Sequence, residues 1–481
     1  MEKLVGLIPA AGMGVRVRPF TKTIPKCMLE IDGTPNLQKN IEIMRDDLGI
    51  QDIYIVIGYL GNVIQEYFGD GSRLGVHITY IENKEINRGL AYSILLAKQH
   101  ISSYFCVILS DESYINSNHK ELNFFPYRNA LITCTVMHVD DWFMIQRNYS
   151  CELEMDRIVR LVEKPKKIIN DILGCGTFIL SPDIFPLLEQ AFEQSSDGYV
   201  EYITFLDDLC QRGEKVLYFT LKGSYVNIND RDSLSLAKYH QRQETFDNNT
   251  VALIIYSEGE EKNIAFTVNQ YRKISAIDSI YVILPFKNSI EETVVKCGAS
   301  IVKCPPDKQL YGEKIKFALE NVSGDILILC EADYTSPNRD IEKLLVYLRE
   351  ADMVVGTRTT RQLIEQGSDM QGTVRITNVL LAKFMEILWW KSESRFTDVG
   401  CTFRAIWKST FNNIKDKLNA IGPEYSAEMM IEVLNLRGRV IEIPVNYFNR
   451  SEAMYRKYRN IKTFFRILLL ILQKRLRCFK R

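Results

Sequence analysis

The stretch LIPAAGMGVRVRPFTKTIPKCMLEIDGTP, residues 7–35, opens as a short apolar run and continues into a loop that carries glycines and cations. Glycine lets the backbone approach an anion and direct N–H groups at it, while cationic side chains neutralise phosphate charge that backbone dipoles alone cannot hold. The glycines are Gly12 and Gly14, and the cations are Arg16, Arg18, Lys22 and Lys26. The pattern predicts a triphosphate-binding loop after the first strand. The alternative is an ordinary strand–helix turn with scattered surface charge.

Composition and charge indicate the number of domains, the cellular compartment and whether nucleic acid is a partner. The 481 residues, 46% of them apolar, exceed what one hydrophobic core usually organises. Sixty basic and sixty acidic side chains cancel, so no whole-protein field favours nucleic acid. Eleven cysteines without a C-x-x-C pair indicate reduced thiols in the cytosol, and the N-terminal apolar run is too short and interrupted for a signal peptide. We expect a cytoplasmic enzyme of two domains with no nucleic acid partner.

The first half alternates β-type runs with helical patterns, which predicts an α/β fold with a mostly parallel sheet flanked by helices. Ligands of such sheets bind at the carboxyl ends of the strands. Asp111 follows the apolar run at 105–109, where it could bind a Mg²⁺ (or Mn²⁺) ion that bridges NTP phosphates. A turn or helix cap is the alternative role for an aspartate in this place.

The ordered run of glycines followed by Arg16, Pro19, Thr21, Pro25 and Lys26 resembles the signature of sugar-1-phosphate nucleotidyltransferases. That resemblance implies a Rossmann-like nucleotide-diphospho-sugar transferase domain over residues 1–245. It also implies that the loop residues Ala11, Gly12 and Gly14 bind the nucleotide and that Arg16 and Lys26 steady the triphosphate.

Four further segments carry the same resemblance. The loop at 87–91 looks like the base-and-sugar loop, with Gly89 against the nucleotide, and Glu163-Lys164-Pro165 matches a motif whose lysine holds the sugar phosphate. Residues 174–177 resemble the sugar-pocket loop, which includes Gly176. In the closing metal motif the usual aspartate is replaced by Asn227. An amide oxygen is a weaker Mg²⁺ ligand than a carboxylate, and Asn229 is the fallback ligand.

The resemblance implies a reaction without a protein nucleophile. A sugar-1-phosphate oxygen attacks the α-phosphorus of an NTP, pyrophosphate leaves, and an NDP-sugar forms. Activation of phosphocholine with CTP is an open alternative, and the sequence names neither the base nor the sugar.

After residue 237 the chain becomes polar, and a new strand–helix pattern begins at 251, which places the domain boundary near 245. In the second half another apolar strand ends in acids, Glu331 and Asp333. Two carboxylates one residue apart at a strand end can hold a divalent ion against a diphosphate leaving group. We therefore expect a second doubly wound domain over 246–455.

This half resembles family 2 glycosyltransferases with a GT-A fold, particularly those that transfer a sugar to polyprenyl phosphate. The opening motif includes Glu260, the strand and metal motif includes Asp333, and the G-S-R step includes Arg358. The segment at 398–404 looks like the acceptor-side motif, with Arg404, and Arg450 stands where a phosphate-binding arginine is expected. The resemblance implies transfer of the sugar from the nucleotide-sugar to a phosphorylated acceptor.

Two departures from that family touch the donor site. Glu258 and Gly259 replace the usual Tyr-Asn, and the segment at 282–286 lacks the aspartate that binds the base. Loss of a charged hydrogen bond of this kind costs about 1.5–3 kcal/mol. A catalytically silent binding or membrane-docking module is therefore the alternative for this half.

The tail at 456–481 contains ten Lys or Arg residues and no Asp or Glu around an apolar run. The run is far short of the roughly 20 residues needed to span a bilayer. We expect a basic amphipathic helix in peripheral contact with an anionic membrane surface at its cytoplasmic face. The alternative is a helix packed on the body with solvated charges.

Overall fold

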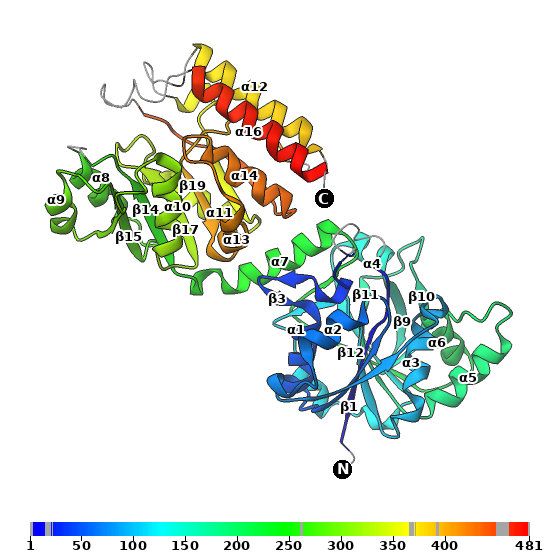
Figure 1. The fold of residues 1–481 in the computed structure, drawn as a ribbon. Helices are drawn as coiled ribbons and strands as arrows, with labels where there is room; N and C mark the ends of the chain where they lie inside the picture. The colour runs from blue at the N-terminus through cyan, green and yellow to red at the C-terminus, as the bar shows by residue number, and fades with distance from the viewer. Residues whose placement is uncertain are drawn as a thin grey trace. The chain divides into compact units, whose positions relative to one another are not determined.

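The computed structural model describes residues 3–14, 21, 23–259, 263–364, 370, 372–390, 394–448 and 461–479. The chain divides into two compact units, Met1–Gln241 and Arg242–Arg481. Helix α7 (Arg231–Thr245) runs through the point of division, so the polar segment after residue 237 is helical. Figure 1 shows each unit as a sheet flanked by helices.

Unit 1 contains a nine-stranded sheet in the order β5-β4-β1-β6-β11-β8-β12-β10-β9. The strands are β1 (Val5–Ala10), β4 (Asp52–Ile57), β5 (His77–Glu82), β6 (Phe105–Ile108), β8 (Ile132–His138), β9 (Tyr149–Glu154), β10 (Arg157–Glu163), β11 (Ile172–Leu180) and β12 (Val216–Thr220). Strands β5, β4, β1 and β6 are parallel, as expected. From β11 onward most pairs are antiparallel, so the sheet is mixed. The physical reason is that neighbours such as β9 and β10 are joined by a tight turn, which only antiparallel strands allow.

Alternate residues of the central strands bury on opposite faces of this sheet. Leu7 belongs to a core under helices α3 (Gly89–Leu95), α5 (Ile184–Gln194) and α6 (Tyr202–Gln211). Its neighbour Ile8 belongs to a second core under α1 (Asn36–Glu42) and α2 (Gly61–Phe68). This two-residue alternation is why an almost wholly apolar strand can be covered on both sides.

Three small features of unit 1 position the candidate site. Strand β7 (Glu112–Ile115) pairs antiparallel with β13 (Ser224–Asn227). The hairpin of β2 (Glu30–Ile31) and β3 (Thr34–Pro35) leads into α1. The short helix α4 (Trp142–Arg147) precedes β9.

Unit 2 contains a seven-stranded sheet in the order β16-β15-β14-β17-β19-β18-β20. The strands are β14 (Val251–Tyr256), β15 (Ser279–Leu284), β16 (Ser300–Lys303), β17 (Ile326–Glu331), β18 (Met353–Thr357), β19 (Arg404–Trp407) and β20 (Val440–Pro444). Only β19 runs antiparallel to its neighbours. The helices are α8 (Ile264–Tyr271), α9 (Glu291–Lys296), α10 (Tyr311–Asn321), α11 (Arg339–Leu348), α12 (Gly372–Leu388), α13 (Lys408–Ile414), α14 (Tyr425–Asn435) and α16 (Ile461–Phe479).

The described helices and cysteines bear on two expectations from the sequence. None of these helices is both long and apolar enough to cross a membrane. Ten of the eleven cysteines, those whose side chains the structure describes, are free thiols, and burial raises the pKa of Cys27 to about 12. Such a thiol is inert at neutral pH.

Candidate active site

The loop after β1 leaves room for a ligand at Gly12 and closes on itself at Gly14. A Cβ added at Gly12 would have no atom within 4 Å. Gly14 has a φ of +57°, and a Cβ there would lie 2.9 Å from the Cβ of Lys26. The hydroxyl of Thr21 donates to the Gly14 carbonyl at 2.8 Å. Gly14 is therefore required for close approach of the loop to Lys26, whereas Arg16 lies outside the described residues.

Lys26 joins the first loop to two distant segments. Its ammonium group lies 2.7 Å from a carboxylate oxygen of Asp111 and donates to the side-chain oxygen of Asn229 at 2.9 Å. Three residues that the sequence singled out thus meet at the carboxyl ends of β1 and β6. Asn229, the fallback metal ligand, has this oxygen occupied by Lys26.

Two buried asparagines of α1 hold the segment around Asp111. The amide of Asn36 donates to the carbonyls of Ser110 and Glu112 at 3.1 and 2.8 Å. Asn40 donates to the Leu109 carbonyl at 3.3 Å. These bonds fix the backbone on both sides of Asp111, so its carboxylate is held in place by α1.

Asn227 faces Glu112, a residue that sequence analysis did not single out. The Asn227 amide donates to a carboxyl oxygen of Glu112 at 3.1 Å and to the side-chain oxygen of Asn148 at 3.0 Å. Glu112 is 1% exposed, and burial, with a smaller contribution from Asp111, holds its pKa well above the usual carboxyl range. The pairing of β7 with β13 brings the two side chains together. That pairing joins segments far apart in the chain, so no local sequence pattern predicts that Glu112 and Asn227 are in contact.

Two buried side-chain oxygens near Asp111 indicate whether this group of residues could bind a divalent cation. The Oδ1 atom of Asn227 and the Oε2 atom of Glu112 are buried and accept no hydrogen bond. Unsatisfied buried oxygens are costly, and hard oxygen donors are what Mg²⁺ prefers. The residues therefore fit such an ion. Within the described ranges, no group of three or more His, Cys, Asp or Glu side chains is arranged as a metal site.

Gly176 on β11 provides a floor for Glu112. A Cβ at this position would lie 2.5 Å from the Glu112 Cγ atom. At Gly174 a Cβ would overlap the ring of Tyr149, whose hydroxyl donates to the Cys175 carbonyl at 3.0 Å. Only glycine fits either position, so the segment expected to be the sugar-pocket loop is instead part of strand β11 and is packed closely around Glu112 and Tyr149.

The predicted phosphate-binding lysine lies at the end of β10. Lys164 has a φ of +44°, and its side chain pairs with that of Glu163. Burial raises the pKa of Glu163, against the opposing effect of Lys164. The Lys164 N–H donates to the Asn148 carbonyl at 2.7 Å, so this residue joins the Asn227 network through Asn148.

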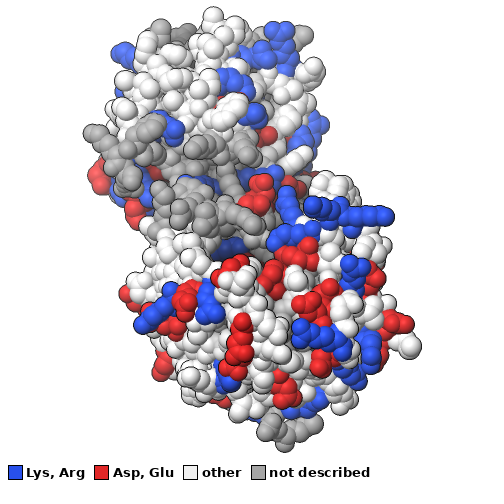
Figure 2. Space-filling view, turned by 90° about the vertical axis from the view of Figure 1, so that its right-hand side faces the viewer, with Lys and Arg blue, Asp and Glu red and all other residues white. Residues whose placement is uncertain are grey.

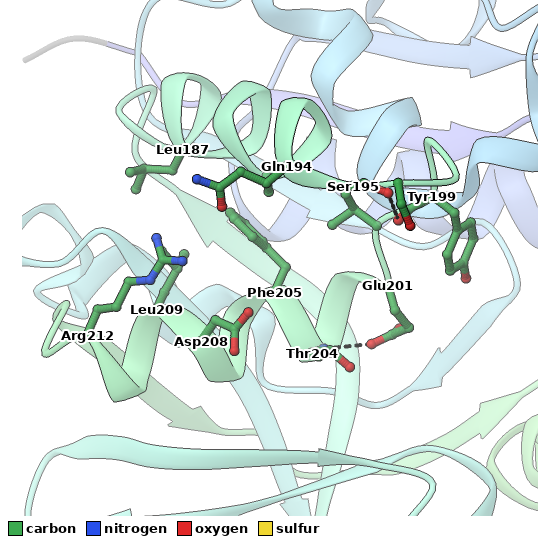
Figure 3. Close-up of a pocket in the computed structure, with 13 residues that line it drawn as sticks. Leu187, Gln194, Ser195, Tyr199, Glu201, Thr204, Phe205, Asp208, Leu209 and Arg212 are labelled. Carbon is green, nitrogen blue, oxygen red and sulfur yellow. Dashed lines mark hydrogen bonds between the residues drawn. The ribbon is translucent and has the colours of Figure 1, made fainter.

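Gly89 begins α3 with a φ of +84°, and a Cβ there would lie 2.7 Å from the Tyr199 ring. Tyr199 also lines a cavity of about 380 Å³ between α5 and α6 (Figure 3). Phe205 and Arg212 line it as well, and Glu201 caps α6 by accepting from the Thr204 N–H. None of the predicted site residues lines this cavity, so it is separate from the Lys26 site.

In unit 2 the two predicted metal carboxylates make contacts with neighbouring groups. Glu331 accepts from the Thr402 hydroxyl at 2.8 Å, which in turn lies 2.7 Å from the Tyr311 hydroxyl. Asp333 accepts from the backbone N–H of Thr335 at 3.3 Å. Both carboxylates thus lie at the end of β17, as expected.

The predicted substrate-binding arginines of unit 2 are engaged in internal contacts. Arg358 pairs with Asp398 at 2.8 Å, and Asn378 donates to the same carboxylate at 2.6 Å. Burial opposes ionisation of Asp398, but Arg358 overcomes it and lowers the pKa. Arg404 is 1% exposed and donates to the carbonyls of Cys401 and Ser426. In this structure Arg404 is part of the core and does not face a ligand site, because its N–H groups donate to backbone carbonyls. Glu260 and Arg450 lie outside the described residues.

Comparison with known proteins supplies a family for unit 1. Residues 5–244 match the family model described as nucleotidyl transferase. UTP–glucose-1-phosphate uridylyltransferase AglF of Haloferax volcanii is 27% identical over 50% of this chain and 97% of its own length. Bifunctional protein GlmU of Methanococcus maripaludis is 30% identical over 46% of this chain, and the match spans half of that relative. Glucose-1-phosphate thymidylyltransferase of Streptomyces antibioticus is 28% identical over 46% of this chain and 60% of its own length. The N-terminal half of the chain therefore matches the nucleotidyltransferase family, as its opening loop indicated.

Proposed function

We propose that unit 1 transfers a nucleotidyl group from an NTP to a sugar-1-phosphate, releasing pyrophosphate and forming an NDP-sugar. The observation that carries the proposal is the contact of Lys26 with Asp111 and Asn229 beside the open backbone at Gly12. A cation and an open glycine loop at strand ends suit a triphosphate. The family match over 5–244 supports the same reaction.

Each of these residues has a part in that reaction. Lys26 neutralises charge that grows on the leaving pyrophosphate, and the glycine loop directs N–H groups at the phosphates. Lys164 steadies the incoming sugar phosphate, and Gly176 makes room for the Glu112 side chain. Asp111 and Asn227 would hold Mg²⁺, which when bound lowers the negative charge on the phosphates. The attacking phosphate oxygen is already ionised, so no general base is required.

The substrates of the relatives suggest where to look first. Two of the relatives are named for glucose-1-phosphate, one with UTP and one as a thymidylyltransferase. We therefore propose a hexose-1-phosphate with a pyrimidine nucleotide. Pyrophosphate release by the full chain should be measured with each NTP against glucose-1-phosphate, N-acetylglucosamine-1-phosphate and phosphocholine. Release with a sugar phosphate supports the proposal. Release only with CTP and phosphocholine would mean that phosphocholine, and not a sugar-1-phosphate, is the acceptor. No release with any pair would overturn the proposal.

A second candidate function concerns unit 2. We propose that Glu331 and Asp333 form part of a site that transfers the sugar from the NDP-sugar to a phosphorylated polyprenyl acceptor. The observation in favour is the pair of carboxylates at the end of β17, in a sheet that is mostly parallel. Such a pair can hold a divalent ion against a departing nucleoside diphosphate.

The contacts around the expected donor position weigh toward the silent-module alternative. A Cβ at Gly259 would lie 2.7 Å from Pro285, so the ends of β14 and β15 are in close contact. Lys314, 2% exposed, pairs with Glu258 at 3.1 Å and lies 4.8 Å from the Tyr256 ring centre. Release of nucleoside diphosphate by the full chain, supplied with NDP-sugar and polyprenyl phosphate, decides between the two. Release that Asp333→Asn removes supports transfer, and no release supports the silent module.

A further inference from the structure

Helix α16 has two apolar faces, and only one of them is packed against the part of unit 2 that the structure describes. Ile467 and Ile471 are buried against the body of unit 2. Lys474, on the same side, pairs with Glu428 and Glu432 at 2.6 Å each. These contacts fix which side of the helix points inward, and they agree with a helix packed on the body.

The outward face of α16 carries a second set of large apolar side chains. Phe465, Leu469, Leu472 and Leu476 are 52%, 55%, 39% and 63% exposed. They recur every three or four residues, so they form one continuous stripe along the helix. A helix that needed only to pack on the body would carry polar residues there.

Helix α12 packs against α16 and lies beside it (Figure 1). It repeats the same arrangement. Leu381 and Met385 are buried, whereas Ile376, Leu380 and Ile387 are 56%, 59% and 65% exposed. Trp390, just beyond the helix, is 64% exposed. Neighbouring exposed apolar stripes of this kind mark a protein or membrane interaction site.

The charges near these stripes are almost entirely positive. Arg466 and Arg477 are exposed next to the α16 stripe, and α16 contains no acidic residue. The acidic residue of α12 is Glu386, which is 9% exposed and paired with Lys383 and Arg395. Near the top of Figure 2, unit 2 presents a largely uncharged surface with Lys and Arg around it and very little Asp or Glu. Such a surface is complementary to a negatively charged one.

We propose that the outer faces of α12 and α16 together form a docking surface for an anionic phospholipid bilayer. The apolar stripes enter the headgroup region, and the flanking arginines contact lipid phosphates. No described helix could cross the membrane, so the attachment is peripheral and weakens with salt. The proposal goes beyond nucleotidyl transfer and does not depend on it. It also adds α12 to the surface that the tail sequence alone predicted.

The test is co-sedimentation of the full chain with vesicles of phosphatidylcholine alone or mixed with phosphatidylglycerol. We expect binding to the anionic vesicles only. The double variant Leu469→Ser/Leu476→Ser should bind roughly tenfold more weakly, and Arg466→Gln/Arg477→Gln should reduce both the binding and its salt dependence. Val346→Ser is the matched control, because this valine of α11 is exposed to a similar extent, 62%.

Folding and self-association need separate readouts. Thermal unfolding of each variant, followed by circular dichroism, shows whether a loss of binding reflects a loss of fold. If the leucine pair misfolds, Leu380→Ser on α12 provides the independent variant. Equal binding of the double leucine variant and the wild-type chain would overturn the proposal. So would binding to both vesicle types alike, or a wild-type dimer that ignores vesicles and dissociates in the leucine variant.

Discussion

The two units each end a buried central strand in carboxylates, yet the surroundings of these carboxylates differ. In unit 1, Asp111 is paired with Lys26, beside an open glycine loop. In unit 2, Glu331 is bonded to Thr402, and the nearby Lys314 is already paired with Glu258. In both units the cation is paired internally, so the difference lies in the backbone: the loop at Gly12 is open, whereas Gly259 lies against Pro285. The difference shows that carboxylates at the end of a central strand do not by themselves imply equal function.

The largest expected effect comes from removing the cation of unit 1. Lys26→Met should lower kcat/KM for pyrophosphate release on the order of 10²–10³-fold, because a donor aimed at developing charge is lost. Steady-state kinetics on folded protein measure this effect. Lys120→Met, on an exposed residue, is the control and should be unaffected. Equal rates for Lys26→Met and the wild type would place the triphosphate elsewhere.

The next effect concerns the internal ion pair of unit 2. Asp398→Asn should lower the free energy of unfolding by about 3 kcal/mol, because Arg358 would remain buried without its counter-charge. Glu292→Gln breaks an exposed pair with Lys296 and should have almost no effect. Urea unfolding of unit 2 measures both variants. A small effect at Asp398 would mean that Arg358 is free to turn toward a ligand. The site of unit 2 would then resemble that of unit 1 more than the ion pair indicates.

A smaller effect is expected where Gly176 supports Glu112. Gly176→Ala places a methyl group 2.5 Å from the Glu112 side chain and should cost about 1–3 kcal/mol of stability. It should also raise KM for the sugar phosphate. Gly12→Ala, with no atom nearby, is the matched control for folding stability. Equal stability of the two variants would show that Glu112 moves aside freely.

The last effect is a pH dependence at Glu112, which is small for any one step in pH. Burial raises its pKa in the folded state above the unfolded value, so its contribution to stability is complete below the unfolded pKa. That contribution is lost as pH rises toward the folded pKa, by up to about 1.4 kcal/mol for each pH unit in that window. Glu112→Gln removes this loss, so its stability relative to wild type should improve as pH rises above the ordinary carboxyl range. Thermal unfolding across pH measures the trend, and parallel curves for the two proteins would contradict it.

The family of the N-terminal half could be predicted from the sequence, because the motifs that indicate it are local. The loop after β1 and the strand before Asp111 are short patterns, and each can be recognised from consecutive residues alone. The family of the N-terminal half followed from them and is confirmed by the match over 5–244.

The parts that sequence reasoning missed depend on pairing between distant segments. Glu112 gains its role from the β7–β13 pairing, and Asn148 from its contact with Asn227. The mixed direction of the unit 1 sheet arises the same way, since an apolar strand reads alike whether its neighbour runs parallel or antiparallel. Arg404 was predicted to bind substrate, but its buried place in β19 depends on carbonyls that no motif specifies. The substrate roles of Glu260, Arg358, Arg404 and Arg450 stay predictions.

The reaction of unit 1 can be identified from its products, by ³¹P NMR after incubating the full chain with Mg²⁺, an NTP and a sugar-1-phosphate. The Lys26–Asp111 site predicts equal amounts of pyrophosphate and an NDP-sugar, with neither formed by Lys26→Met. Nucleoside diphosphate and inorganic phosphate as the only products would mean hydrolysis at the γ-phosphate, and would contradict the assignment of unit 1 as a nucleotidyltransferase.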